Sequence, residues 1–179
     1  ELKGFIYWDD AFTGKRPGVL VAHEWWGLND YAKLRAEMLA ETGYVAFAAD
    51  MYGAGKITRH ADEAKGWMQQ ISSNAEAWQR RANLALEQLR AHPQVDAERL
   101  AAIGYCFGGK GVLELARSGV DVAGAGVQHR QGMATHRRQR RVGVLLDQRA
   151  PRGPRGFVRK IGVIAQQSLA AEHLGVDAH

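Results

Sequence analysis

Short apolar runs alternate with amphipathic segments along most of the chain. A continuous apolar run is typical of a strand covered on both faces, and apolar residues three and four positions apart are typical of a helix. The predicted strands are residues 2–7, 19–22, 44–49, 100–105 and 120–127, and the predicted helices are residues 30–41, 61–71, 75–91 and 110–117. This alternation predicts an α/β fold with a doubly wound, mostly parallel sheet and helices on both faces.

The pattern weakens toward the end of the chain. Residues 142–146 could add a strand and residues 161–174 a helix, but the segment between them is rich in arginine, glycine and proline. Residues 128–179 carry 10 Lys+Arg against 3 Asp+Glu, whereas residues 1–127 carry 14 against 16, so the net charge of +5 comes entirely from this end. So sharp a change predicts either a basic tail or a segment whose sequence is not the one that the fold expects.

Composition narrows the class of protein. With 179 residues, 46% of them hydrophobic and 24% charged, the chain is expected to form a single globular domain over residues 1–179. No apolar run approaches the roughly 18 residues of a membrane span, and no signal peptide is visible. A single cysteine excludes an internal disulfide and fits a reducing compartment. We therefore expect a cytoplasmic protein, a monomer or dimer, with no membrane partner.

The one cysteine, Cys106, lies where the predicted strand 100–105 gives way to a glycine-rich helical start. Gly104, Cys106 and Gly108 have the spacing of the G-x-nucleophile-x-G elbow, with cysteine in place of the usual serine. In such a turn the nucleophile stands above the sheet, at the N-terminus of a helix that favours its thiolate. The competing interpretation is a small buried apolar residue, which a lone cysteine often is. The elbow spacing makes Cys106 the candidate nucleophile.

Two backbone N–H groups are candidates for stabilising an oxyanion beside Cys106. One belongs to Phe107, which follows the nucleophile, and the other to Trp25, in the loop after the first buried strand. Trp25 and Trp26 could instead pack the core. Side by side in a loop, however, at least one of them is expected to line a substrate pocket, together with Tyr105 from the elbow.

Two polar residues stand beside these tryptophans. A carboxylate among bulky apolar groups should be partly desolvated, which makes Glu24 the second candidate catalytic residue. The alternative for Glu24 is a surface acid or a helix-capping acid. His23 could act as a general base, but its place at the end of a buried strand favours a structural role.

Three loops, 23–28, 50–56 and 104–109, follow the carboxyl ends of predicted strands. Ligands bind at these ends in open α/β sheets, so we expect the three loops to meet at one site. Asp50 opens the second loop and is expected to bind the backbone of that loop rather than to take part in catalysis.

Other chemistries fit the sequence less well. Residues 104–111 are glycine-rich like a phosphate loop, but the lysine is not followed by Ser or Thr and the glycine spacing differs. The arginine-rich end could bind nucleic acid, yet it lacks interleaved aromatic residues and any recognised module. No Cys/His cluster has metal-ligand spacing. We expect no metal, no other cofactor and no nucleic-acid partner.

Three stretches resemble the dienelactone hydrolase (carboxymethylenebutenolidase-like) family of α/β-hydrolases. They are residues 16–29 (RPGVLVAHEWWGLN), 49–53 (ADMYG) and 104–109 (GYCFGG), and they occur in the family's order. The similarity covers about residues 4–127. It implies the α/β-hydrolase fold and a Cys-His-Asp triad that needs no cofactor.

The resemblance also assigns roles to single residues. It matches Cys106 to the nucleophile and Glu24 to the family's glutamate, which contacts the resting cysteine and helps to control its activation. It matches the backbone N–H groups of Phe107 and Trp25 to the donors of the oxyanion hole.

Other family residues have no clear counterpart in this sequence. The triad's Asp and His are unknown, because Asp147 comes too early and His173 and His179 do not sit in the expected context. Arg59 and Arg81 lie in the stretch where the family binds a substrate carboxylate, but no motif fixes either one.

These gaps and the change in charge lead to one hypothesis about the end of the chain. Residues 128–179 are expected to be incomplete or not the true native sequence, through a reading-frame error or truncation. Intact mass and peptide mapping of the purified protein would test this.

The sequence predicts a hydrolase that cleaves a carboxylic ester or lactone through a Cys106 thioester. The alternative is an inactive or truncated relative that binds a small molecule or a partner, because the chain shows no identifiable Asp and His for the triad.

Overall fold

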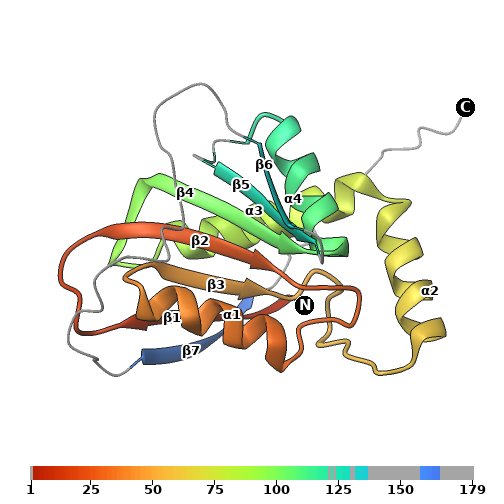
Figure 1. Cartoon of the computed structure of the whole chain (residues 1–179), viewed down its shortest axis with the longest axis horizontal. Coiled ribbons are helices and arrows are strands. Elements are labelled where there is room, and N and C mark those ends of the chain that lie inside the picture. Colours follow the sequence, from red (N-terminus) through yellow and green to blue (C-terminus); the bar gives the residue numbers. More distant parts are fainter. Residues whose placement is uncertain (1, 121, 123, 130–131, 137–157, 166–179) are drawn as a thin grey trace, which may run out of the picture.

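The computed structural model describes residues 2–120, 122, 124–129, 132–136 and 158–165 (Figure 1). Strands and helices alternate through most of this part of the chain. The strands are β1 (Leu2–Asp9), β2 (Arg16–Ala22), β3 (Val45–Ala49), β4 (Val95–Tyr105), β5 (Gly124–His129), β6 (Gly132–His136) and β7 (Val158–Ala165). The helices are α1 (Asp30–Glu41), α2 (Ala61–Ser72), α3 (Ala75–Arg90) and α4 (Phe107–Arg117).

The described strands form one seven-stranded sheet in the order β6-β5-β4-β2-β3-β1-β7. The inner strands β5, β4, β2 and β3 run parallel. β6 pairs antiparallel with β5 at one edge, and β1 and β7 continue the sheet antiparallel at the other. In Figure 1 the arrowheads of β2, β3 and β4 point to the same edge. The predicted α/β architecture, with its parallel centre, is confirmed.

Helices cover both faces of the central strands. Neighbouring residues of a strand point to opposite faces. In β2, Leu20 joins a core with Leu86 of α3, and Val21 joins a second core with Leu39 of α1. Figure 1 shows α1 in front of the sheet and α3 and α4 behind it. This double covering explains the uninterrupted apolar runs.

Helix α1 begins and ends at the residues that the sequence indicates. The Asn29 side chain accepts a hydrogen bond from the Ala32 N–H at 3.2 Å, which satisfies one free donor of the first turn. Gly43, with a φ of 91°, follows the helix end. The cap fixes the far end of the loop that precedes α1.

Four elements begin three or more residues from the predicted position. β2 begins at Arg16 rather than residue 19, and β4 begins at Val95 rather than residue 100. α4 begins at Phe107 rather than residue 110, because both glycines after Phe107 are helical and the first of them, Gly108, packs closely against β2. β5 begins at Gly124 rather than residue 120.

The helix predicted for residues 161–174 is wrong in its first part. Residues 161–165 belong to β7, which pairs antiparallel with β1 so that Ile161 lies opposite Ile6. The β-branched residues of this segment favour a strand, and pairing with β1 outweighs the weak helical spacing. Four sequence assignments fall outside the described residues: the strand 142–146, Asp147, His173 and His179.

Candidate active site

The loops that follow β2, β3 and β4 start at the same edge of the sheet, in register with one another. In the parallel register, Ala22 pairs with Ala49 on one side and with Gly104 on the other. The loops after β2 and β3 and the turn after β4 therefore start side by side at the carboxyl edge, where α/β sheets bind ligands. This confirms the predicted meeting of the three loops.

Cys106 occupies a strained turn between β4 and α4. Its φ of 52° and ψ of −111° lie in a region that glycine adopts far more readily than other residues. The side chain is exposed, so the interpretation as a buried apolar residue is wrong. Cys106 is also the N-cap of α4, so its side chain stands beside the free N–H groups of this helix end.

Two glycines let this turn press against β2. A Cβ at Gly104 would lie 2.3 Å from the carbonyl group of Gly108. A Cβ at Gly108 would lie 2.4 Å from the carbonyl oxygen of His23 and 2.6 Å from that of Ala22. These are backbone atoms, so no side-chain rotation could relieve the contacts. The elbow is thus packed against the start of the loop that carries Glu24 and Trp25.

His23 is fully buried and serves this loop as a hydrogen-bonding group. Its Nε2 accepts from the Met51 N–H at 3.0 Å, so the ring proton lies on Nδ1, which donates to the Glu24 carbonyl oxygen. Burial lowers the pKa of His23, while the Glu24 carbonyl and the Asp50 charge oppose this shift. With both nitrogens engaged, the structural role expected for His23 is the one observed.

The buried imidazole predicts a pH dependence of stability. Because the folded-state pKa of His23 is lowered from 6.5, below about pH 6.5 the unfolded chain binds a proton that the folded chain does not. The free energy of unfolding should therefore fall as the pH drops from about 6.5 toward the folded-state pKa, by at most about 1.4 kcal/mol per pH unit. Urea unfolding at several pH values measures this slope.

The control is a histidine on the surface. His23→Asn should reduce the slope, whereas the same change at the exposed His60 should leave it as in the parent chain. His92, whose pKa is also lowered by burial, adds a slope of the same sign to both variants. An equal slope in His23→Asn and the parent chain would contradict the assignment.

Asp50 organises the loop after β3. Its buried carboxylate accepts hydrogen bonds from three N–H groups of its own loop, at 2.8 to 3.0 Å, as the sequence led us to expect. From α3, Arg81 Nη1 donates to the carbonyl oxygens of Met51 at 2.7 Å and Tyr52 at 3.0 Å. This loop is therefore held from both sides.

Tyr52 joins all three loops. Its hydroxyl donates to the Trp25 carbonyl oxygen at 2.9 Å, and its ring stacks on Phe107 with centroids 5.5 Å apart. Burial raises the pKa of Tyr52, and the nearby Cys106 adds to the shift. Sequence reasoning assigned Tyr52 no role, although its place two residues after Asp50 in the ADMYG stretch was the available signal.

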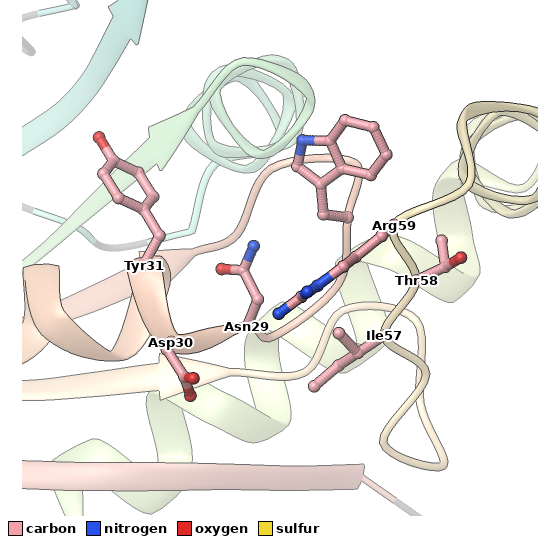
Figure 2. A pocket seen from close by; sticks show the side chains of 7 residues that line it. Asn29, Asp30, Tyr31, Ile57, Thr58 and Arg59 are labelled. Carbon is pink, nitrogen blue, oxygen red and sulfur yellow. The ribbon is translucent and has the colours of Figure 1, made fainter.

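A cavity of about 390 Å³ opens beside the loop after β2. In Figure 2 the Arg59 side chain extends across it toward Asn29. Seven residues line it: Trp26, Asn29, Asp30, Tyr31, Ile57, Thr58 and Arg59.

The two tryptophans of this loop have different surroundings. Trp26 lines it, whereas Trp25 packs against the main core, with the two rings 4.9 Å apart in an edge contact. Trp26 thus lines a cavity, and the expectation that this cavity takes a substrate stays a prediction. Tyr105 is buried and approaches the cavity only through Tyr31, whose ring centroid lies 5.6 Å away.

Glu24 is half-buried between these features. Its charge contributes to raising the pKa of Tyr105, a shift caused mainly by burial and opposed by Arg35. In the part of the chain that the structure describes, the Glu24 carboxylate makes no hydrogen bond or ion pair.

The described residues contain no group of three or more His, Cys, Asp or Glu side chains that could hold a metal ion. Among the same residues, no helix has the length and apolar character needed to cross a membrane.

Comparison with known proteins gives a consistent result. The model of the Dienelactone hydrolase family matches residues 2–140. The solved structure named m3DLH is 45% identical, with a TM-score of 0.68 over 70% of this chain and 52% of that one. A dienelactone hydrolase-like promiscuous phosphotriesterase from metagenomic libraries is 44% identical, with a TM-score of 0.67 over the same shares.

A curated relative from Bradyrhizobium sp is described as a "probable 2-oxo-3-(5-oxofuran-2-ylidene)propanoate lactonase". It is 29% identical over 106 residues, which make up 59% of this chain and 43% of the relative. The chain therefore spans about half the length of the proteins it matches. The resemblance seen in the sequence is confirmed.

Proposed function

The chain belongs to the dienelactone hydrolase family, and on that premise we propose that it hydrolyses a carboxylic ester or lactone through Cys106. The observation that carries the proposal is the exposed cysteine in a strained turn at the N-terminus of α4. Strain of this kind persists only where the surrounding structure enforces it, and it clusters at functional sites. Here Gly104 and Gly108 enforce it through close packing.

The proposed first step is attack by the Cys106 thiolate on the carbonyl carbon. A C–S bond forms, and the carbonyl π electrons move to oxygen, where the N–H groups of Phe107 and Trp25 stabilise the charge. Collapse of this intermediate breaks the C–O bond and releases the alcohol, or opens the lactone ring, and leaves a thioester. A histidine, whose position in this sequence is unknown, would give a proton to the leaving oxygen. Water would then attack the thioester and release the acid and the Cys106 thiolate.

Glu24 has a proposed regulatory part in this cycle. Its half-buried carboxylate lies in the loop packed against the elbow and makes no hydrogen bond with the described residues. It could accept one from the resting Cys106 thiol if its side chain turned toward the elbow, and release it when substrate binds.

The cavity suggests the kind of substrate. Trp26, Tyr31 and Ile57 offer apolar surface, while Arg59 could hold an anionic group of the substrate. The lactonase relative makes lactones the first class to assay. The relative titled a phosphotriesterase makes phosphotriesters the second, because a thiolate and two N–H donors could also act at a tetrahedral phosphorus centre.

The proposal predicts turnover that depends on the thiol. The full chain should hydrolyse p-nitrophenyl acetate, and prior alkylation with iodoacetamide should lower the rate at least about 100-fold, because Cys106 is the only cysteine. Intact mass spectrometry of the chain mixed briefly with this ester should show one added acetyl group, and peptide mapping of the same sample should place it on the Cys106 peptide.

The controls separate an enzyme from an inactive relative. Turnover that survives alkylation would contradict a cysteine nucleophile. A folded chain without any turnover of esters, lactones or phosphotriesters would favour a relative that only binds small molecules.

A further inference from the structure

We infer that the Tyr52 hydroxyl and the His23 imidazole are positioning groups of the oxyanion hole. Together they hold the two successive peptide groups on either side of Trp25, so that the Trp25 N–H faces the elbow. The inference rests on the proposed function, because it needs this N–H to be a donor to the reacting oxygen.

His23 fixes the first peptide group, between Glu24 and Trp25. The Glu24 carbonyl oxygen accepts from His23 Nδ1 and, at 3.3 Å, from the Gly27 N–H. The described chain contains no cis peptide bond, and in a trans peptide the C=O and N–H point in opposite directions. The Trp25 N–H is therefore turned away from His23, and it donates to no acceptor in the described part of the chain.

Tyr52 fixes the second peptide group, between Trp25 and Trp26. Its hydroxyl donates to the Trp25 carbonyl oxygen at 2.9 Å. Burial raises the pKa of this phenol above its usual value of about 10, so the hydroxyl stays protonated and remains a donor at neutral pH. With both flanking carbonyls held, the peptide plane that carries the Trp25 N–H has little freedom to turn.

The Tyr52 ring is itself held in place by aromatic neighbours. Its centroid lies 4.9 Å from that of His23, 5.8 Å from that of Trp67 and 5.5 Å from that of Phe107. Phe107 supplies the other proposed N–H donor. The Tyr52 ring thus contacts Phe107, and its hydroxyl holds the peptide group that follows Trp25.

The support behind Tyr52 is rigid. Asp50 accepts hydrogen bonds from three N–H groups of the loop, and the Arg81 guanidinium donates to the Met51 and Tyr52 carbonyl oxygens, which belong to the peptide groups before and after Tyr52. His23 Nε2 takes the Met51 N–H as well. The loop after β3 is therefore held in place, and through Met51 and Tyr52 it fixes the position of the loop after β2.

Loss of a positioning group should lower kcat, whereas loss of a merely structural group should also alter the rate of Cys106 alkylation and the melting temperature. Tyr52→Phe removes one hydroxyl and keeps the ring contacts. We expect the kcat for p-nitrophenyl acetate to fall about 10-fold with KM unchanged, less than the roughly 100-fold to 1,000-fold seen when an oxyanion donor is removed outright. Alkylation of Cys106 by iodoacetamide forms no oxyanion, so its rate should stay within about 2-fold of the parent.

A second readout does not depend on turnover. An alkyl trifluoromethyl ketone adds to the thiolate to form a C–S bond, and the carbonyl electron pair becomes an oxyanion held by the same N–H donors. Fluorine NMR of the full chain follows this adduct, whose affinity should fall about 10-fold in Tyr52→Phe. The matched control is Tyr44→Phe, a half-buried tyrosine packed against the α1-side core, which should leave every readout unchanged.

His23 offers a test by selective rescue. An asparagine amide N–H can take the place of Nδ1–H and hold the Glu24 carbonyl, whereas a glutamine amide reaches the place of Nε2 and holds only Met51. His23→Asn should therefore retain more kcat and more adduct affinity than His23→Gln, at similar thermal stability.

Three results would overturn the inference. The first is a Tyr52→Phe variant whose kcat and adduct affinity both stay within about 2-fold of the parent. The second is a loss that appears equally in alkylation rate and melting temperature, which would make Tyr52 structural. The third is a parent chain that hydrolyses esters but forms no adduct with the trifluoromethyl ketone. A parent chain that forms the adduct normally but hydrolyses no ester would count against the proposed function alone.

Discussion

Replacing Cys106 by glycine is expected to abolish ester hydrolysis while raising the free energy of unfolding by about 1 kcal/mol. The side chain is exposed, so its removal leaves no cavity. Backbone strain of the kind seen at φ 52° costs about 1–3 kcal/mol, and glycine relieves it at an entropic cost of about 0.5–1 kcal/mol. Without the thiolate, turnover should fall at least about 1,000-fold. Urea unfolding and an ester assay on the same preparation measure both effects.

Cys106→Ala separates the two effects. Alanine lacks the nucleophile but keeps the Cβ, and with it the strain. This variant should be as inactive as the glycine variant, with a free energy of unfolding within about 0.5 kcal/mol of the parent. If the glycine variant proved less stable than the alanine variant, the turn would not be strained.

Replacing Gly108 by alanine is expected to lower the free energy of unfolding by about 3 kcal/mol. The added methyl would meet the carbonyl oxygens of His23 and Ala22 at 2.4 and 2.6 Å. Because these atoms belong to the end of β2 and the loop after it, relief requires α4 to move away from the sheet. Activity should fall as well, since that movement separates Cys106 from the Trp25 N–H. Thermal unfolding and the ester assay test both.

The matched control is Gly66→Ala in α2. Gly66 is exposed and its added Cβ would have no atom within 4 Å. Alanine is the better helix former, so this variant should gain about 0.5–1 kcal/mol. A Gly108 variant as stable as the parent would show that the elbow is not tightly packed against β2.

The central sheet and the elbow could be predicted from sequence for physical reasons. A parallel strand covered by helices on both faces needs an unbroken apolar run, and β2 and β3 show one. The elbow needs residues without a Cβ at two fixed places, so Gly104 and Gly108 leave a spacing that can be read directly.

Other parts of the site have no local pattern. The bonds from Tyr52 to Trp25 and from Met51 to His23 span 27 and 28 residues, and they join side chains to backbone atoms. Any residue can supply a backbone carbonyl or N–H, so the sequence marks only one partner of each pair. The protonated nitrogen of His23 follows from the Met51 N–H, which only the folded chain brings near.

The wrong helix over 161–165 has a similar cause. This segment is a strand because it adds to β1 at the edge of the sheet, and its partner lies about 150 residues away along the chain. Local spacing carries no information about such a partner.

Ala22, Ala49 and Gly104 pair with one another at the carboxyl edge of the sheet, and inserted residues should have different effects before and after this row. One residue inserted upstream of this row, inside β2, would exchange the strand's two faces and turn Leu20 toward α1 and Val21 toward α3. One residue inserted downstream of Ala22 or Ala49 would leave the pairings of β2 and β3 intact and lengthen only a loop. Libraries that vary loop length to change substrate preference should therefore insert residues beyond Gly55, whose N–H is the last that Asp50 binds, and leave His23, Asp50 and the alanines before them fixed.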